Sequence, residues 1–149
     1  MARQRDVGEK PRVHRRAIAE GELRTRPSTR NAIRARRVEK GDPLAAGELA
    51  GLLAMKRTSE LIPHCHAVPL TSSSVELQLS RQGVKVRAES ETVDRTGVEM
   101  EALVGATVAL LTVWDMVKYL EKDARGLHPA TSIGPVRVVA KAKSGTEAA

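Results

Sequence analysis

The residues best suited to proton transfer interrupt a long apolar stretch in the C-terminal third of the chain. Asp115 and Lys118 are three residues apart, which places them on one face of a helix. A carboxylate beside an ammonium shifts the pKa of both groups, as an acid–base pair requires. The same spacing is typical of a simple surface ion pair, so the pair alone leaves both interpretations open.

A second group of carboxylates lies where the same helix is predicted to start. Thr96 and Glu99 have the spacing of a capping box, which predicts a structural role for Glu99. Glu101 has no such explanation, and its carboxylate can accept hydrogen bonds from the N–H groups of a guanine-like ring.

The separation of these two groups bears on quaternary structure. Asp115 follows Glu101 by fourteen positions, which on a helix is roughly four turns, or roughly 21 Å at about 1.5 Å per residue. The two side chains point the same way, but one small-molecule site cannot readily use both from a single helix. We therefore predict an oligomer whose active sites lie at subunit interfaces, arranged as isologous pairs.

Lys40 precedes Gly41 and Asp42 at a break between two predicted helices. Glycine frees the backbone, so the lysine can reach into a cleft and hold a phosphate or act as an acid. A surface turn with a solvated lysine is the simpler alternative, and the tripeptide by itself favours it.

The loop His64-Cys65-His66 lies between Pro63 and Pro69. Three potential ligands in succession suggest a metal, but adjacent residues rarely all face one ion, and no second Cys or His pair lies at ligand spacing. Nucleophilic use of Cys65 requires a base and an orienting group, and neither is identifiable. We expect the loop to offer backbone amides and an imidazole to a polar ligand, without a metal.

The composition indicates one compact domain over residues 1–149, with an aliphatic core. Hydrophobic residues make up 41% of the chain, and phenylalanine is absent. The single cysteine excludes an intrachain disulfide and fits a reducing cytoplasm. No secretory signal is visible, and the apolar stretch 102–114 is too short to cross a bilayer. We expect a cytoplasmic protein without a membrane segment.

The net charge of +7 is concentrated in the first 40 residues, which hold 13 Lys or Arg and 5 Asp or Glu. The remainder carries a balance of −1. Such a segment attracts polyanions, which include nucleic acid, a membrane surface or a polyphosphorylated small molecule. A solvated arm explains the arginines of residues 1–12 equally well.

Hydrophobic periodicity and breaks predict the order β-α-α-β-β-α-β. This order is typical of an α+β, ferredoxin-like subunit, with an antiparallel sheet, helices on one face and one additional helix. We expect residues 1–10 and 144–149 to be flexible ends. The predicted strands are 12–23, 75–79, 84–93 and 136–139, and the predicted helices are 27–37 (capped by Ser or Thr), 44–57 and 96–122, with a loop at 124–134.

Several short segments occur together in a characteristic order. They are Lys40-Gly-Asp, Lys-Arg-Thr-Ser-Glu-Leu-Ile-Pro at 56–63, Cys65-His66, Thr-Gly-Val-Glu-Met-Glu-Ala-Leu at 96–103 and Trp-Asp-Met-Val-Lys at 114–118. The set resembles the MoaC family of cyclic pyranopterin monophosphate synthases over residues 5–143. The segment 96–103 is specific alone, and the ordered set is more so.

This resemblance implies a lyase of molybdenum-cofactor biosynthesis, which needs no resident cofactor. The family converts 3′,8-cyclo-7,8-dihydro-GTP, made by a radical-SAM GTP cyclase, to cyclic pyranopterin monophosphate with release of pyrophosphate. Mg²⁺ can accompany the triphosphate, but the sequence has no dedicated cage for it. The resemblance also implies a homohexamer, a trimer of dimers with active sites at the dimer interface, and a transient contact with the cyclase.

The resemblance also suggests roles for individual residues. Asp115 and Lys118 match the catalytic pair, and Lys40 matches a lysine that can protonate a ring nitrogen or the leaving group. The loop departs from a common family form at His64 and Ala67. The residues that match substrate-binding positions are His64, Cys65, His66, Glu99, Met100 and Glu101, together with Arg15, Lys56 and Lys141 for the triphosphate.

Two other functions compete with this one. A basic nucleic-acid-binding module would use the charged N-terminal segment and the ferredoxin-like sheet, but the predicted strands lack the aromatic residues on which bases stack. A metal protein would use His64, Cys65 and His66.

Overall fold

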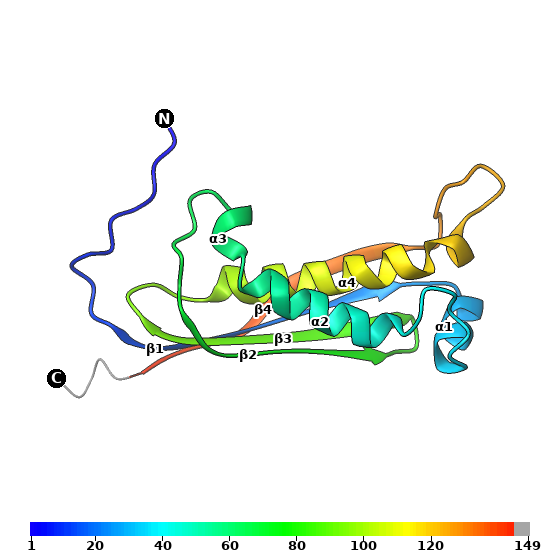
Figure 1. Cartoon of the computed structure of the whole chain (residues 1–149), viewed down its shortest axis with the longest axis horizontal. Coiled ribbons are helices and arrows are strands. Elements are labelled where there is room, and N and C mark those ends of the chain that lie inside the picture. Colours follow the sequence, from blue (N-terminus) through cyan, green and yellow to red (C-terminus); the bar gives the residue numbers. More distant parts are fainter. Residues whose placement is uncertain (145–149) are drawn as a thin grey trace.

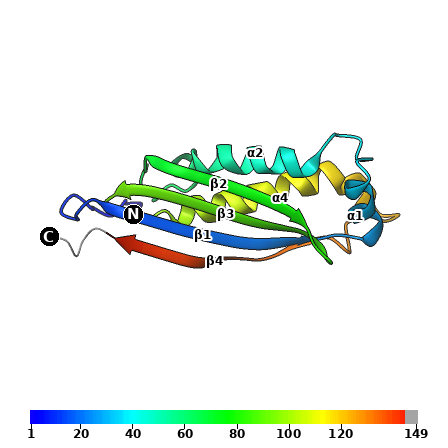
Figure 2. The same ribbon diagram turned by 90° about the horizontal axis from the view of Figure 1, so that it is seen from below.

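The computed structural model describes residues 1–144 as a four-stranded antiparallel sheet with helices over one face (Figures 1 and 2). The strand order is β2-β3-β1-β4, so each crossover joins parallel strands that have one antiparallel strand between them. This confirms the predicted α+β, ferredoxin-like plan. The elements are β1 (Val13–Arg24), α1 (Pro27–Arg34), α2 (Pro43–Met55), α3 (Thr58–Leu61), β2 (Leu70–Leu79), β3 (Gly83–Asp94), α4 (Glu99–Glu121) and β4 (Ser132–Ser144).

The largest errors of prediction concern the two edge strands. Strand β2 begins at Leu70 rather than at residue 75, and β4 spans Ser132–Ser144 rather than 136–139. The added residues are all exposed or half-buried, so they carry no burial signal, and backbone pairing to β3 and β1 extends these strands. The one-turn helix α3 was also not predicted. Residues 145–149, part of the end expected to be flexible, lie outside the described residues.

The core is aliphatic, and α2 packs closely against α4 at two glycines. A Cβ at Gly51 would lie 2.7 Å from the carbonyl oxygen of Gly105, and a Cβ at Gly105 would lie 2.6 Å from Met55 Cγ. Alanine at either position would therefore push the helices apart. This contact fixes α4 relative to the rest of the fold, and α4 carries both groups of candidate site residues.

Two predicted helix caps were wrong. Helix α1 begins after Arg26 with no side-chain cap from Ser28 or Thr29, and α4 begins after Val98 without the capping box of Thr96 and Glu99. A distant residue satisfies the start of α1, and Glu99 instead pairs with β4.

The distant residue is Glu121, which is fully buried at the end of α4. Its carboxylate accepts hydrogen bonds from the Arg26 N–H (3.0 Å to Oε1), the Thr29 hydroxyl (2.5 Å to Oε2) and the Thr131 hydroxyl (2.7 Å to Oε1). It therefore links α4 to α1 and to the loop before β4.

Helix α4 is long and apolar enough to cross a membrane by length and composition, with a mean hydropathy of 1.5 over its best window. Half of that window is buried inside the molecule, as expected for the core helix of a globular fold.

Candidate active site

Lys40, Asp115 and Lys118 form one cluster at the surface. Lys40 Nζ lies 2.9 Å from Asp115 Oδ2, and Lys118 Nζ lies 2.7 Å from Asp115 Oδ1. Lys40 Nζ also donates to the Asp115 carbonyl oxygen at 3.2 Å. The structure thus brings together the three residues predicted to be catalytic, although Lys40 and Asp115 are 75 positions apart in the sequence.

The turn before α2 delivers Lys40 to this cluster. Gly41 has a φ of +106°, which only glycine adopts without strain. Asp42 caps α2 by accepting hydrogen bonds from the N–H groups of Leu44 and Ala45. Tyr119 Oη accepts a hydrogen bond of 2.9 Å from the Glu39 N–H, next to Lys40. Tyr119 therefore holds the backbone at Glu39, directly before Lys40, while Asp115 holds the Lys40 side chain. The sequence did not indicate this role of Tyr119.

The electrostatics of the cluster suit an anionic ligand. Lys118 and then Lys40 lower the pKa of Asp115 to about 2 by hydrogen bonding and charge, so the carboxylate stays ionised across the physiological range. Two ammonium groups share this single carboxylate, which leaves one positive charge in excess. Such a cluster can bind a phosphate oxygen and exchange protons with a substrate.

A second ionic group lies at the opposite end of α4. Glu99 forms an ion pair with Lys141 of β4. Arg15 of β1 donates to the carbonyl oxygens of Asp94 and Arg95, both at 3.1 Å. Burial alone would raise the pKa of Glu99, but Lys141 and Arg15 outweigh it and lower that pKa. Three of the predicted substrate-binding residues thus come together here.

Glu101, two residues after Glu99 in α4, is 3% exposed. Its Oε1 lies 3.8 Å from Cys65 Sγ, and its Oε2 has no hydrogen-bond partner among the described residues. Burial raises the pKa of Glu101, and burial together with the charge of Glu101 raises the pKa of the Cys65 thiol. A buried carboxylate oxygen without a donor is costly, and a ligand N–H would relieve that cost.

The other four predicted substrate-binding residues make no hydrogen bond or ion pair with the side chains of Glu99 or Glu101 among the described contacts. Met100 is 41% exposed on the first turn of α4. Lys56 lies apart, beside the start of β2, where it lines a shallow depression with residues 68–73. His64 and His66 are bonded to the backbone of the N-terminal segment rather than to α4.

Within one chain, therefore, the candidate residues other than Lys56 form two separate groups, one at each end of α4. No group of three or more His, Cys, Asp or Glu residues that could hold a metal occurs within residues 1–144.

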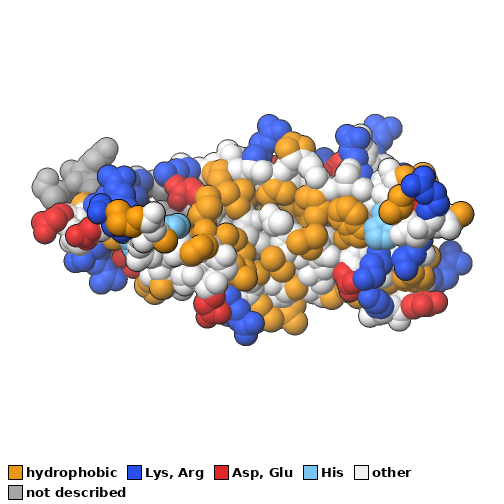
Figure 3. Space-filling view, turned by 90° about the horizontal axis from the view of Figure 1, so that it is seen from above, with side chains coloured by type: hydrophobic (Ala, Val, Ile, Leu, Met, Phe, Trp, Pro, Cys, Tyr) orange, Lys and Arg blue, Asp and Glu red, His pale blue; other side chains and the backbone are white. Residues whose placement is uncertain are grey.

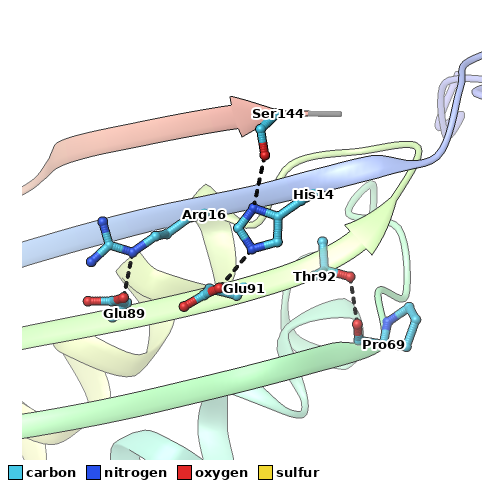
Figure 4. A network of polar contacts seen from close by, with 7 residues as sticks. All are labelled: His14, Arg16, Pro69, Glu89, Glu91, Thr92 and Ser144. Carbon is cyan, nitrogen blue, oxygen red and sulfur yellow. Dashed lines mark hydrogen bonds and ion pairs between the residues drawn. The ribbon is translucent and has the colours of Figure 1, made fainter. Parts of the chain in front are cut away.

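The uncovered face of the sheet carries paired charges. Arg16 Nε lies 2.5 Å from Glu89, and His14 Nε2 lies 2.7 Å from Glu91 (Figure 4). Further along the same face, Arg87 pairs with Glu20 at 2.7 Å. Positive and negative side chains are therefore mixed on this face, which is not a continuous basic surface.

The sequence profile of the MoaC family matches residues 4–144. This chain belongs to the MoaC family. A MoaC relative in Archaeoglobus fulgidus is 50% identical over 142 residues, which cover 95% of this chain and 91% of the relative. A relative in Pyrococcus furiosus is 47% identical, over 93% of this chain and 88% of the relative. One in Sulfolobus acidocaldarius is 48% identical, over 93% of this chain and 97% of the relative. All three bear the name "probable cyclic pyranopterin monophosphate synthase".

Proposed function

We propose that this MoaC-family chain is a cyclic pyranopterin monophosphate synthase of molybdenum-cofactor biosynthesis. The reaction converts 3′,8-cyclo-7,8-dihydro-GTP to cyclic pyranopterin monophosphate and releases pyrophosphate, which makes the enzyme a phosphorus–oxygen lyase. The cluster of Lys40, Asp115 and Lys118 carries the proposal, because it places two proton donors and one acceptor on a positively charged surface. The names of the relatives support the same activity.

The proposed roles follow from charge and burial. Lys40 and Lys118 donate protons during ring opening and reclosure, and Asp115 orients both lysines through its two ion pairs. The unpartnered oxygen of Glu101 accepts an N–H of the purine-derived ring. Lys141 and Arg15 provide positive charge for the triphosphate and for the departing pyrophosphate.

We further propose that two subunits complete each site through α4. A row of Val104, Val108 and Leu111 lies on this helix between Glu101 and Asp115, and none of the three is buried. Leu111 is 50% exposed, and Leu49 of α2 is 60% exposed. Seen from above, hydrophobic side chains gather along the middle of the helix face, and charged side chains lie toward both ends (Figure 3). Such a surface favours association.

Two copies of α4 packed antiparallel would join the two groups of site residues. Residue 108 is the midpoint between 101 and 115, so a two-fold axis near Val108 brings Glu101 of one copy opposite Asp115 of the other. The apolar row would then form the centre of an isologous interface. Three such dimers would give the hexamer that the family resemblance implies.

Three further parts of the proposal rest on the sequence and on the resemblance. We propose that no resident cofactor is needed, that Mg²⁺ enters only with the triphosphate, and that the enzyme acts in the cytoplasm, where it receives its substrate from the radical-SAM GTP cyclase. Elemental analysis and an activity assay with a chelator test the first two parts.

A basic nucleic-acid-binding module is a weaker alternative. The open sheet face carries ion pairs of both signs, and both aromatic residues that could stack on bases, Trp114 and Tyr119, lie in α4.

The decisive experiment incubates purified protein with 3′,8-cyclo-7,8-dihydro-GTP and measures pyrophosphate and the cyclic product. Lys40→Ala, Asp115→Asn and Lys118→Ala should each lower kcat by about 10²-fold or more while the oligomer survives. Lys85→Ala, on the open sheet face, is the matched control and should retain full activity. Full activity in all three cluster variants would reject the proposed mechanism.

A further inference from the structure

The N-terminal segment is bonded to the candidate substrate loop by three consecutive contacts. His64 Nδ1 lies 2.7 Å from the Arg3 carbonyl oxygen, and His66 Nε2 lies 2.6 Å from the Arg5 carbonyl oxygen. Between them, the Gln4 side-chain amide donates to the Cys65 carbonyl oxygen at 3.0 Å. Residues 3–5, here called the strap, thus bind residues 64–66, although 61 positions separate each pair.

These contacts determine where each imidazole carries its proton. A carbonyl oxygen only accepts hydrogen bonds, so the ring nitrogen that faces it must be the protonated one. His64 therefore carries its proton on Nδ1, and His66 carries its proton on Nε2. In the neutral rings, His64 Nε2 and His66 Nδ1 remain as acceptors for ligand N–H or O–H groups.

The strap also acts on the buried carboxylate of α4. Gln4 holds the backbone of Cys65, and the Cys65 thiol lies 3.8 Å from Glu101 Oε1. One short chain of contacts therefore runs from the strap through the loop to Glu101. The strap belongs to the basic N-terminal segment, for which the composition also allowed a solvated arm, and these contacts join it to the candidate site.

We propose that the strap is a positioning element of the substrate site. It fixes the loop and the tautomers of His64 and His66 so that both rings present acceptors to the purine-derived or ribose part of the substrate. The role in substrate binding rests on the proposed function, but the tautomers do not.

The first test reads the tautomers by ¹⁵N NMR of the histidine rings at pH 8, above the ordinary range of imidazole titration. His64 should be an Nδ1–H tautomer, and His66 should be Nε2–H. His14 and His128 are internal controls: the first donates from Nε2 to Glu91, and the second accepts at Nδ1 from Trp114, so both should be Nε2–H.

A chain that begins at Asp6 lacks the strap, and a chain that begins at Arg3 is the matched control. Without the strap, His64 and His66 should change to an averaged mixture of tautomers, while His14 and His128 keep theirs. Gln4→Ala, which removes one bond and keeps the chain length, should give a smaller change in the same direction. An Nε2–H tautomer for His64 in the full chain, or no change on removing the strap, would overturn the proposal.

Steady-state kinetics provide the second test. The chain that begins at Asp6 should show KM raised about tenfold, as the loss of one or two net hydrogen bonds predicts, with kcat changed less than KM. An unchanged KM would reject the role in binding. If neither the full chain nor the control turns over the cyclised dihydro-GTP, the proposed function fails, and the NMR result still decides whether the strap fixes the loop.

Discussion

Replacing Glu121 tests whether one buried carboxylate holds three parts of the fold together. In the wild type, each oxygen of Glu121 accepts two hydrogen bonds, because the Arg26 N–H is shared between them. In Glu121→Gln, one of these two oxygens becomes an NH₂ group. The new donor faces the Arg26 N–H and a threonine hydroxyl, so one bond is lost and the hydroxyl must reorient.

The loss can be estimated from the bond types. Hydrogen bonds to a charged group contribute about 1.5–3 kcal/mol and neutral ones about 1 kcal/mol, so two weakened or lost bonds should lower the free energy of unfolding by about 2–4 kcal/mol. For a chain of this length, that corresponds to a fall in Tm of about 5–15 °C.

Urea denaturation followed by circular dichroism and Trp114 fluorescence measures the change, at equal protein concentrations because assembly adds stability. Glu39→Gln is the control, since Glu39 is exposed and its replacement should change the free energy of unfolding by less than about 0.5 kcal/mol. If Glu121→Gln unfolds at the same urea concentration as the wild type, the carboxylate does not join these elements.

Other predictions concern the two ends of α4. Because burial raises the pKa of Glu101 above its ordinary value of 4.5, the wild type should lose stability as pH rises through that folded-state pKa. Glu101→Gln should abolish this loss, and pH-dependent denaturation measures it. The pKa of Glu99 is lowered, so Glu99→Gln should instead remove stability present above pH 4.5, and identical pH profiles for the two variants would contradict the assignment. Because the pKa of Asp115 is low, protonation of this group should not lower kcat at any pH above about 4. A fall in kcat at acid pH that is absent from Asp115→Asn would refute this prediction. Leu111→Lys should raise the dimer dissociation constant by about 100-fold, and an unchanged sedimentation profile would exclude the α4 interface.

The central parts of the fold could be predicted because their sequence signals are local. Strands β1 and β3 were located within one residue of their bounds. Alternating burial marks β3, and apolar residues set among polar ones mark β1. The ion pair of Asp115 and Lys118 follows from helical spacing alone.

The errors arise where the deciding contact is distant. Glu99 pairs with Lys141 because β4 continues past residue 139, where the predicted strand ended, so the local capping signal gave the wrong role. Glu121 could have been identified, because it continues the buried stripe of Leu110 and Val117 at helical spacing. Nothing local to residues 3–5 indicates that they bond to a loop 61 positions away.

A mixing experiment tests the shared site most directly. Glu101→Ala and Lys118→Ala should each be inactive alone, since every site lacks one essential group. In a co-expressed mixture, half of the dimers contain one copy of each variant, and one of the two sites in such a dimer is free of both substitutions. We therefore predict recovery of about one quarter of wild-type activity. An inactive mixture in which mixed dimers are verified by mass spectrometry would contradict it.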